Sequence, residues 1–216
     1  MTPPSDRLLR FDRSVRWVHQ ATAGLMLTCL ATAACLYLPP LAQLVGNRRT
    51  VVLLHVWCGT ALPVPFLCGL ALRAVRDDAA RLSRFGRADW AWLRAVRRRL
   101  PDRPAGKFNA GQKLYAQWTL GSMLVMLGTG LAMWWTGLAP LAWRMGATFV
   151  HDWVAWAVGA SVVAHVVMAL RDPEARKGMS TGTVDRGWAA REHPLWSGEP
   201  DRDDEPMVQE GRQISP

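Results

Sequence analysis

The chain has 216 residues, half of them hydrophobic, and a formal net charge of +9 from 26 basic and 17 acidic side chains. A soluble domain would spread its apolar residues at helix or strand periodicity, whereas here they are segregated into long blocks almost free of charge. This pattern excludes an ordinary soluble domain and indicates a polytopic membrane protein.

Four apolar blocks are near or above the roughly 20 residues that a helix needs to cross a bilayer: residues 17–38, 51–72, 114–135 and 147–170. The first block is interpreted as a retained span, because it is too long for an ordinary cleaved signal and cleavage would remove His19. The first span should stop at Pro39-Pro40, and Pro63 and Pro65 should kink the second.

Basic residues alternate between the two sides of these blocks. Four lysines and arginines precede the first block, two follow it, twelve lie in residues 73–113, one lies in the third loop and seven follow the fourth block. This is the positive-inside pattern, and it puts the N-terminus, the central loop and the C-terminus in the cytoplasm. Topology therefore explains the basic charge, and no nucleic-acid partner is expected.

We predict an all-α integral membrane four-helix bundle over residues 1–172 and a cytoplasmic tail over 173–216, disordered in 198–216. In the central loop, residues 88–100 set tryptophans and aliphatic residues against arginines, as in a basic amphipathic helix that lies on the cytoplasmic membrane face or against a partner. The four cysteines fall within predicted spans without a Cys-x-x-Cys pair, so they are interpreted as core residues.

Four histidines lie inside or at the rims of the apolar blocks: His19, His55, His151 and His165. An imidazole is costly in hydrocarbon without a partner, so such histidines are candidates for a functional site. His151 and His165 are fourteen positions apart in one block, a spacing that returns to nearly the same helix face about 21 Å further along. One helix therefore offers a ligand near each side of the bilayer.

Depth in the membrane decides which histidines can meet. His19 and His165 lie near the cytoplasmic ends of their helices, and His55 and His151 lie near the periplasmic rim. We therefore predict that His19 with His165, and His55 with His151, each bind one b-type haem iron. Two axial imidazoles leave no open position, so such haems carry electrons. The alternative is that these histidines only serve helix packing.

Other polar residues have open interpretations. His193 lies in the polar tail and is not expected to bind haem. Asp152, beside His151, either orients a ligand ring or takes up a proton, or it caps the start of the fourth helix. The arginines at positions 10, 13 and 16 either pair with haem propionates or set the topology. Asn109 and Gln112 fit an N-cap and its return partner at the start of the third helix.

These residues resemble the gamma subunit of membrane-bound formate dehydrogenase, a four-helix di-haem cytochrome b, over nearly the whole chain. One departure is Gln20 after His19, where such chains commonly have an aromatic residue. The motifs that carry the resemblance are Arg10-Phe11-Asp12-Arg13, Trp17-Val18-His19, Lys107–Lys113 (KFNAGQK), the helix with His151 and His165, and in the tail Gly178-Met179, Gly182-Thr183-Val184, Trp188-Ala189 and His193-Pro194-Leu195-Trp196.

The resemblance implies the same two haems and a menaquinone or ubiquinone site at Asn109, Gly111 and Gln112 beside the cytoplasmic haem. It also implies the bacterial inner membrane as the location, and an iron–sulphur (beta) subunit and a catalytic (alpha) subunit as partners. Electrons would pass from the periplasmic iron–sulphur subunit across the membrane to quinone. Nothing in the chain could hold molybdenum or tungsten, so it would reduce quinone without formate chemistry of its own.

Two other functions fit the sequence. The first is the cytochrome b anchor subunit of a hydrogenase or another periplasmic dehydrogenase, with the same haems and a different electron donor. The second is a haem-free four-helix membrane protein, such as a small transporter or an assembly factor. A haem spectrum separates the second from the first, and the co-purifying subunits identify the donor.

Overall fold

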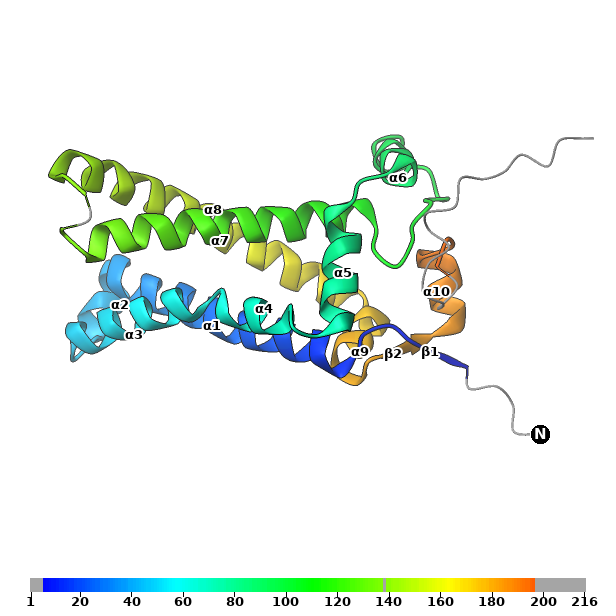
Figure 1. Cartoon of the computed structure of the whole chain (residues 1–216), viewed down its shortest axis with the longest axis horizontal. Coiled ribbons are helices and arrows are strands. Elements are labelled where there is room, and N and C mark those ends of the chain that lie inside the picture. Colours follow the sequence, from blue (N-terminus) through cyan, green and yellow to red (C-terminus); the bar gives the residue numbers. More distant parts are fainter. Residues whose placement is uncertain (1–5, 138, 197–216) are drawn as a thin grey trace, which may run out of the picture.

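The computed structural model describes residues 6–137 and 139–196. Its long helices run side by side as a bundle (Figure 1), with α1 packed against α3, α7 against α8, and α3 in contact with α7. The bundle has a sheet end, where strands β1 and β2 lie, and an α2 end on the opposite side (Figure 1). The long helices are α1 (Arg13–Tyr37), α3 (Arg48–Ala61), α7 (Ala110–Trp134) and α8 (Leu141–Arg171).

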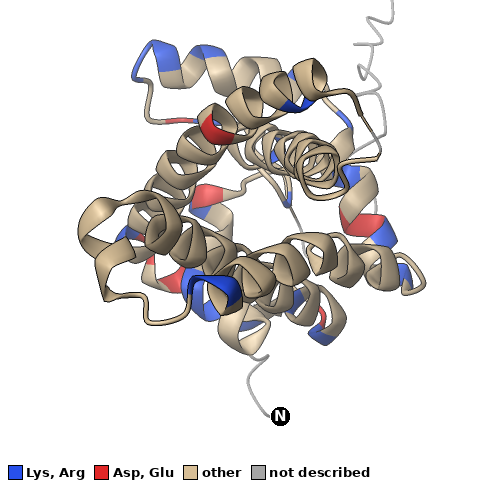
Figure 2. Cartoon of the chain, turned by 90° about the vertical axis from the view of Figure 1, so that its left-hand side faces the viewer, with Lys and Arg blue, Asp and Glu red and all other residues tan. Residues whose placement is uncertain are grey.

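Three helical segments of the described chain are long and apolar enough to cross a membrane: Arg13–Tyr37, Arg48–Gly69 and Leu141–Arg171. The fourth predicted span lies on α7, which is 25 residues long. Helix α7 is not one of these three segments, because polar residues such as Gln117 and Thr129 lower its mean hydropathy. In the end-on view of Figure 2 the bundle helices are drawn mostly in the colour of uncharged residues.

The outer surface of the bundle is apolar. Only Val158 is buried among the 31 residues of α8. Many large apolar side chains on the bundle helices are more than half exposed, among them Trp57, Phe149, Trp153, Val163 and Met168. Soluble proteins rarely expose contiguous apolar surfaces of this kind, so the structure is that of a helical membrane protein.

Prolines divide the helices at the α2 end and in the second block. Helix α1 ends at Tyr37, before Pro39-Pro40, and α2 (Pro39–Leu44) begins directly after it with proline in its first turn. The prolines interrupt the second block as expected. Helix α3 ends at Ala61 and α4 (Val64–Gly69) begins after Pro63, while the backbone of Leu62 and Pro63 stays helical. Helix α8 begins at Leu141 with Pro140 as its N-cap, six residues before the start expected from the sequence.

The central loop folds into α5 (Arg73–Ser83) and α6 (Arg87–Arg97), and α6 confirms the amphipathic helix expected at 88–100. Each helix buries one aspartate, Asp78 in α5 and Asp89 in α6. The Lys107 ammonium donates to the Asp78 carboxylate, and the Lys113 ammonium donates to Asp89 at 2.9 Å. The two lysines of KFNAGQK therefore hold α5 and α6 against the start of α7.

The first half of the polar tail is folded, which the sequence did not indicate. Strand β1 (Arg7–Leu9) pairs antiparallel with β2 (Thr183–Asp185), and Leu8 lies opposite Val184. The tail also forms α9 (Pro173–Thr181) and α10 (Arg186–Glu192). The prediction of an all-α fold thus missed a two-stranded sheet, and the predicted disorder of 198–216 lies outside the described residues.

A small core closes the sheet end, where Val184, Trp188 and Ala189 are buried and pack against Leu8 and Trp196. Two glycines permit this packing. Gly182 ends α9 with φ +94°, and a Cβ there would lie 2.8 Å from the Phe11 carbonyl oxygen. A Cβ at Gly178 would lie 2.8 Å from a Val184 methyl carbon. The tail motif of the sequence therefore consists of packing residues.

Candidate functional site

The four intramembrane histidines lie in two pairs at different depths of the bundle. The rings of His19 on α1 and His165 on α8 have centroids 6.3 Å apart, toward the sheet end. The rings of His55 on α3 and His151 on α8 also have centroids 6.3 Å apart, toward the α2 end. The structure therefore brings together the two pairs expected from depth alone.

The separation within each pair fits a metal ion held between two imidazoles. A metal–imidazole bond is about 2.0 Å and a ring nitrogen lies about 1.1 Å from the ring centre, so ligands on opposite sides of one ion have centres about 6.2 Å apart. Direct packing or a hydrogen bond between two rings would not require this spacing twice. The planes within the pairs meet at 49° for His19–His165 and 68° for His55–His151.

Threonine hydroxyls contact the pair near the α2 end. Thr32 Oγ1 of α1 lies 2.9 Å from His55 Nδ1, and Thr129 Oγ1 of α7 lies 2.9 Å from His151 Nδ1. The His151 ring also lies over Gly130, where a Cβ would be 3.4 Å from Cε1. In both rings Nδ1 therefore has a protein partner, and Nε2 remains for a ligand.

The pair near the sheet end has an aromatic neighbour instead. The ring of Tyr115 on α7 stacks on His165, with centroids 4.8 Å apart and planes 6° from parallel. Neither Tyr115 nor the two threonines was identified from the sequence, because helix spacing does not show which residues of different helices meet. A tyrosine and threonines within apolar blocks were the only available signal.

The predicted quinone residues lie at the start of α7. Asn109 Oδ1 accepts from the Gln112 backbone N–H at 2.9 Å, and Gln112 Oε1 accepts from the Asn109 N–H at 3.0 Å. This capping box confirms the N-cap expected from the sequence. It uses the amide oxygens only, so both side-chain NH₂ groups remain potential donors.

Gly111 has a packing role in the structure. A Cβ at this position would lie 3.2 Å from Trp92 Cη2 of α6 and 3.3 Å from Asn109 Oδ1. Glycine therefore allows Trp92 to approach the first turn of α7 closely. This contact accounts for a glycine at position 111 even if no ligand binds there. It also puts the Trp92 ring close to the Asn109 amide group.

Two arginines near the start of α1, Arg10 and Arg16, bind the folded tail. The Arg10 guanidinium donates to the Lys107 carbonyl oxygen at 3.0 Å and to His193 Nε2 at 2.8 Å, and it lies over the Trp188 ring at 4.8 Å. Arg16 donates to the Ser180 carbonyl oxygen. Burial lowers the Arg10 pKa to about 10, partly opposed by Asp172 and Asp78.

His193 is buried in this cluster rather than exposed in the tail. Its Nδ1–H donates to the Gly106 carbonyl oxygen at 2.7 Å, while Nε2 accepts from Arg10. Burial, and secondly the Arg10 charge, lower the His193 pKa to about 4. Both ring nitrogens are engaged, so neither remains for a metal ion.

Asp152 has a partner on another helix. It lies in the interior of α8, which begins at Leu141, so the expectation that it caps this helix is wrong. The helix begins before residue 147 because residues 141–146 contain no proline, and Pro140 is the N-cap. The Tyr37 hydroxyl donates to the Asp152 carboxylate. Asp152 therefore joins the end of α1 to α8 next to His151.

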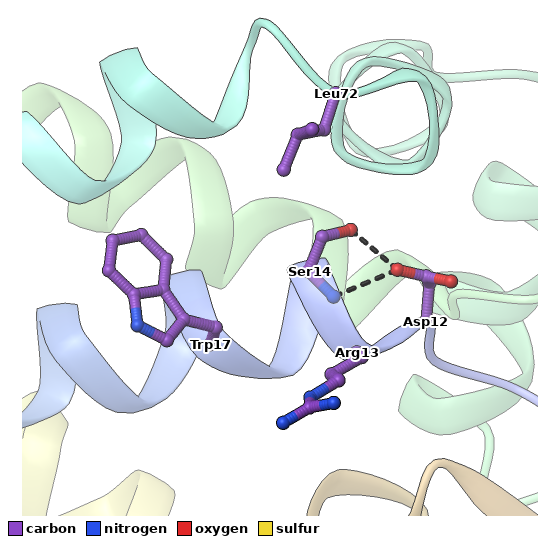
Figure 3. A pocket seen from close by; sticks show the side chains of 5 residues that line it. All are labelled: Asp12, Arg13, Ser14, Trp17 and Leu72. Atoms are coloured by element: carbon purple, nitrogen blue, oxygen red, sulfur yellow. Dashed lines mark hydrogen bonds between the residues drawn. The ribbon is translucent and has the colours of Figure 1, made fainter.

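An open pocket of about 400 Å³ lies at the start of α1 (Figure 3). Asp12 is held there as N-cap, because its carboxylate accepts from the Ser14 backbone N–H at 2.8 Å and from the Ser14 hydroxyl at 2.6 Å. These bonds lower the Asp12 pKa. None of the predicted haem-ligating histidines or quinone residues lines this pocket, whose walls are Asp12, Arg13, Ser14, Trp17 and Leu72.

Comparison with known proteins gives a family match over most of the chain. The family described as prokaryotic cytochrome b561 matches residues 10–182, a range that contains both histidine pairs. The cytochrome b556(Fdn) subunit of the nitrate-inducible formate dehydrogenase of Escherichia coli K12 is 34% identical over 95 residues, 42% of this chain and 43% of that relative. The chain thus matches less than half the length of this relative.

Two further relatives are also named as cytochrome b556 subunits of formate dehydrogenases. The formate dehydrogenase cytochrome b556(fdo) subunit of E. coli K12 is 22% identical over 200 residues, 88% of this chain and 92% of the relative. The formate dehydrogenase cytochrome b556 subunit of Haemophilus influenzae is 31% identical over 95 residues, 42% of this chain and 40% of the relative. These names confirm the resemblance stated from the sequence motifs.

Proposed function

Because the chain belongs to the prokaryotic cytochrome b561 family, we propose that it is the membrane-anchoring di-haem cytochrome b subunit of a formate dehydrogenase. It passes electrons from a periplasmic iron–sulphur subunit across the bacterial inner membrane to menaquinone or ubiquinone at the cytoplasmic side. Its partners are this iron–sulphur subunit and a catalytic subunit that oxidises formate.

The observation that supports this proposal most strongly is the spacing of the histidine pairs. Each pair has ring centroids 6.3 Å apart, the separation expected for two imidazoles on one metal ion. Family membership implies b-type haem, and two pairs at two depths favour two haems. A haem held by both histidines of a pair would supply one-electron transfer and would have no coordination position left for a substrate.

The orientation of the chain in the membrane follows from its charges. The loop of residues 73–113, with its twelve basic residues, connects to the sheet end through Arg10 and Lys107. The positive-inside rule therefore favours a cytoplasmic location for the sheet end, where β1 and β2 pair. His19 and His165 then lie on the cytoplasmic side and His55 and His151 on the periplasmic side, with α1, α3–α4, α7 and α8 as the four spans.

The start of α7 is the proposed quinone site. The NH₂ groups of Asn109 and Gln112 can donate to the quinone oxygens, since their amide oxygens already accept backbone N–H groups. Tyr115, one turn further along α7, stacks on His165. The proposed site thus lies one helix turn from a side chain that contacts the cytoplasmic histidine pair.

Electron transfer in this direction stores energy. Negative charge moves inward from the periplasmic to the cytoplasmic side, and quinone reduction takes up protons from the cytoplasm. Each charge moved across the membrane corresponds to about 2.3 kcal/mol per 100 mV of membrane potential.

A difference spectrum of membranes that contain the complex tests the proposal. Formate should reduce a substantial share of the b-type haem that dithionite reduces, and added quinone should reoxidise it. Haem that only dithionite reduces would contradict the formate assignment, and hydrogen would then be the next donor to try. Absence of b-type haem from membranes shown to contain the protein would overturn the cytochrome assignment.

A further inference from the structure

Two threonines on different helices contact the same histidine pair in the same way. Thr32 is buried on α1, and its Oγ1 lies 2.9 Å from His55 Nδ1. Thr129 is half-buried on α7, and its Oγ1 lies 2.9 Å from His151 Nδ1. The helices that carry the threonines pack against the helices that carry the histidines, α1 against α3 and α7 against α8.

The single hydroxyl hydrogen of each threonine is already used within its own helix. Thr32 Oγ1 lies 2.7 Å from the Thr28 carbonyl oxygen and 3.0 Å from that of Cys29. Thr129 Oγ1 lies 2.7 Å from the Val125 carbonyl oxygen and 3.2 Å from that of Met126. A carbonyl oxygen can only accept, so the hydroxyl is the donor in these bonds.

Each hydroxyl must then accept a hydrogen bond from the imidazole. The hydrogen of His55 and of His151 is therefore on Nδ1, and the lone pair is on Nε2, the nitrogen left for an axial ligand bond. If the hydroxyl donated to Nδ1 instead, Nε2 would carry the hydrogen and could not bind iron, and the carbonyl bonds at 2.7 Å would be lost.

We propose that Thr32 and Thr129 are positioning residues that fix the tautomer and the orientation of His55 and His151 and lower the reduction potential of the haem between them. This inference rests on the proposed function, because it assumes that the pair binds haem. A hydrogen bond from Nδ1–H to an acceptor raises the basicity of the ligating nitrogen. A more basic ligand stabilises the oxidised iron, and the potential falls.

The second pair lacks this arrangement. Within the described part of the chain, no hydrogen bond reaches a ring nitrogen of His19 or His165, and the neighbour of His165 is the stacked Tyr115 ring. The threonines therefore make the reduction potentials of the two haems unequal, with the lower potential at His55–His151. Electrons then run downhill from this pair toward His19 and His165, the direction required for reduction of quinone in the cytoplasmic half.

The test compares Thr32→Val and Thr129→Val with the wild-type complex. Valine keeps the branched shape of threonine and removes the hydroxyl. Thr60→Val is the matched control, since Thr60 Oγ1 on α3 bonds the Val56 and Trp57 carbonyl oxygens at 2.9 and 3.1 Å but no imidazole. Thr32→Ser and Thr129→Ser keep the hydroxyl.

The readouts are haem content and a redox titration of the b-type absorbance in the solubilised complex. Haem content of the wild-type complex tests the proposed function, and the variants test the threonines. We expect each valine variant to raise the midpoint potential of one haem and leave the other unchanged, while the serine variants and Thr60→Val match the wild type. Loss of one haem in a valine variant, restored by serine, also supports the proposal.

Other results would overturn it. If both midpoint potentials stay at their wild-type values in both valine variants with two haems bound, the hydroxyls do not act on the ligands. The same conclusion follows if the serine variants lose haem as the valine variants do, because shape rather than the hydroxyl would then be required. An equal change in Thr60→Val would assign the effect to helix packing.

Discussion

The Tyr115 ring stacks on the His165 ring, with the ring centres 4.8 Å apart and the planes 6° from parallel. The two residues belong to different helices, α7 and α8, so the orientation of this imidazole depends on a helix that contains no histidine. Tyr115 also follows Gln112 by three residues, which is the next turn on the same side of α7. Tyr115 therefore lies one turn from the proposed quinone residues and stacks on the proposed cytoplasmic haem ligand.

Replacing Tyr115 with leucine should release the His165 ring. The stack is worth about 1 kcal/mol, so we expect the protein to fold with both haems bound. The electron paramagnetic resonance signal of the oxidised His19–His165 haem should shift, because it depends on the angle between the two ligand planes. Tyr115→Phe should keep the wild-type spectrum. A Tyr115→Leu spectrum with both haem signals unchanged would show that the stack does not orient the His165 ring.

Single histidine variants test the assignment of ligands to two separate haems. His151→Ala should remove only the periplasmic haem and His165→Ala only the cytoplasmic one, because each removes an axial ligand from one pair. Haem content by pyridine haemochrome should fall from two to one per chain in each variant. His193→Gln, which changes the histidine outside both pairs, should retain two. Retention of both haems in both alanine variants would exclude the pairing.

The capping box allows a sharp test of the quinone site. Gln112→Glu and Asn109→Asp keep an oxygen that accepts the same backbone N–H, and a carboxylate is favoured at a helix N-terminus. Both substitutions remove the NH₂ donor. One such hydrogen bond is worth about 1 kcal/mol, so quinone reduction should fall by roughly fivefold or more in each variant.

The stability of α7 and the haem content should remain at the wild-type level in these variants. Gln112→Ala provides the comparison, since it removes both the donor and the return bond of the cap. Wild-type rates of quinone reduction in both carboxylate variants would assign Asn109 and Gln112 to helix capping alone.

The sequence predicted the features that depend on local composition. The apolar blocks predict the bundle helices. The expected depth of each histidine in the membrane predicts the two pairs that the structure brings together. It could not show that Thr32 faces His55 or that Tyr115 faces His165, because such contacts depend on the rotation of one helix against another. The sequence predicts only a polar tail over residues 173–196, because Val184 and Trp188 are too sparse to form a periodic pattern.

The start of α8 was misplaced for a related reason. Trp143 and Arg144 interrupt the apolar block, so the sequence favoured a loop up to 147, whereas a helix continues through both residues from Leu141. A charged side chain ends a hydrophobic run without ending a helix. With the helix start at Leu141, the cap, one of the roles that the sequence leaves open for Asp152, is excluded.

The contact of His193 with Arg10 predicts how the docking of the tail depends on pH. His193 is 2% exposed, and burial together with the Arg10 charge lowers its pKa to about 4 in the folded protein. In an undocked tail the pKa is about 6.5. The undocked state therefore binds more protons between these values, so docking is strongest above about pH 6.5 and weakens as the pH falls toward 4.

The shift corresponds to a loss of about 3 kcal/mol over this range. Hydrogen-exchange protection factors of residues 183–196, which already allow for the intrinsic effect of pH, should fall accordingly between pH 7 and pH 4.5. His193→Gln cannot titrate, so its protection should be lower than wild type at pH 7 and nearly independent of pH. Equal pH dependence in the two proteins would show that His193 is not the responsible group.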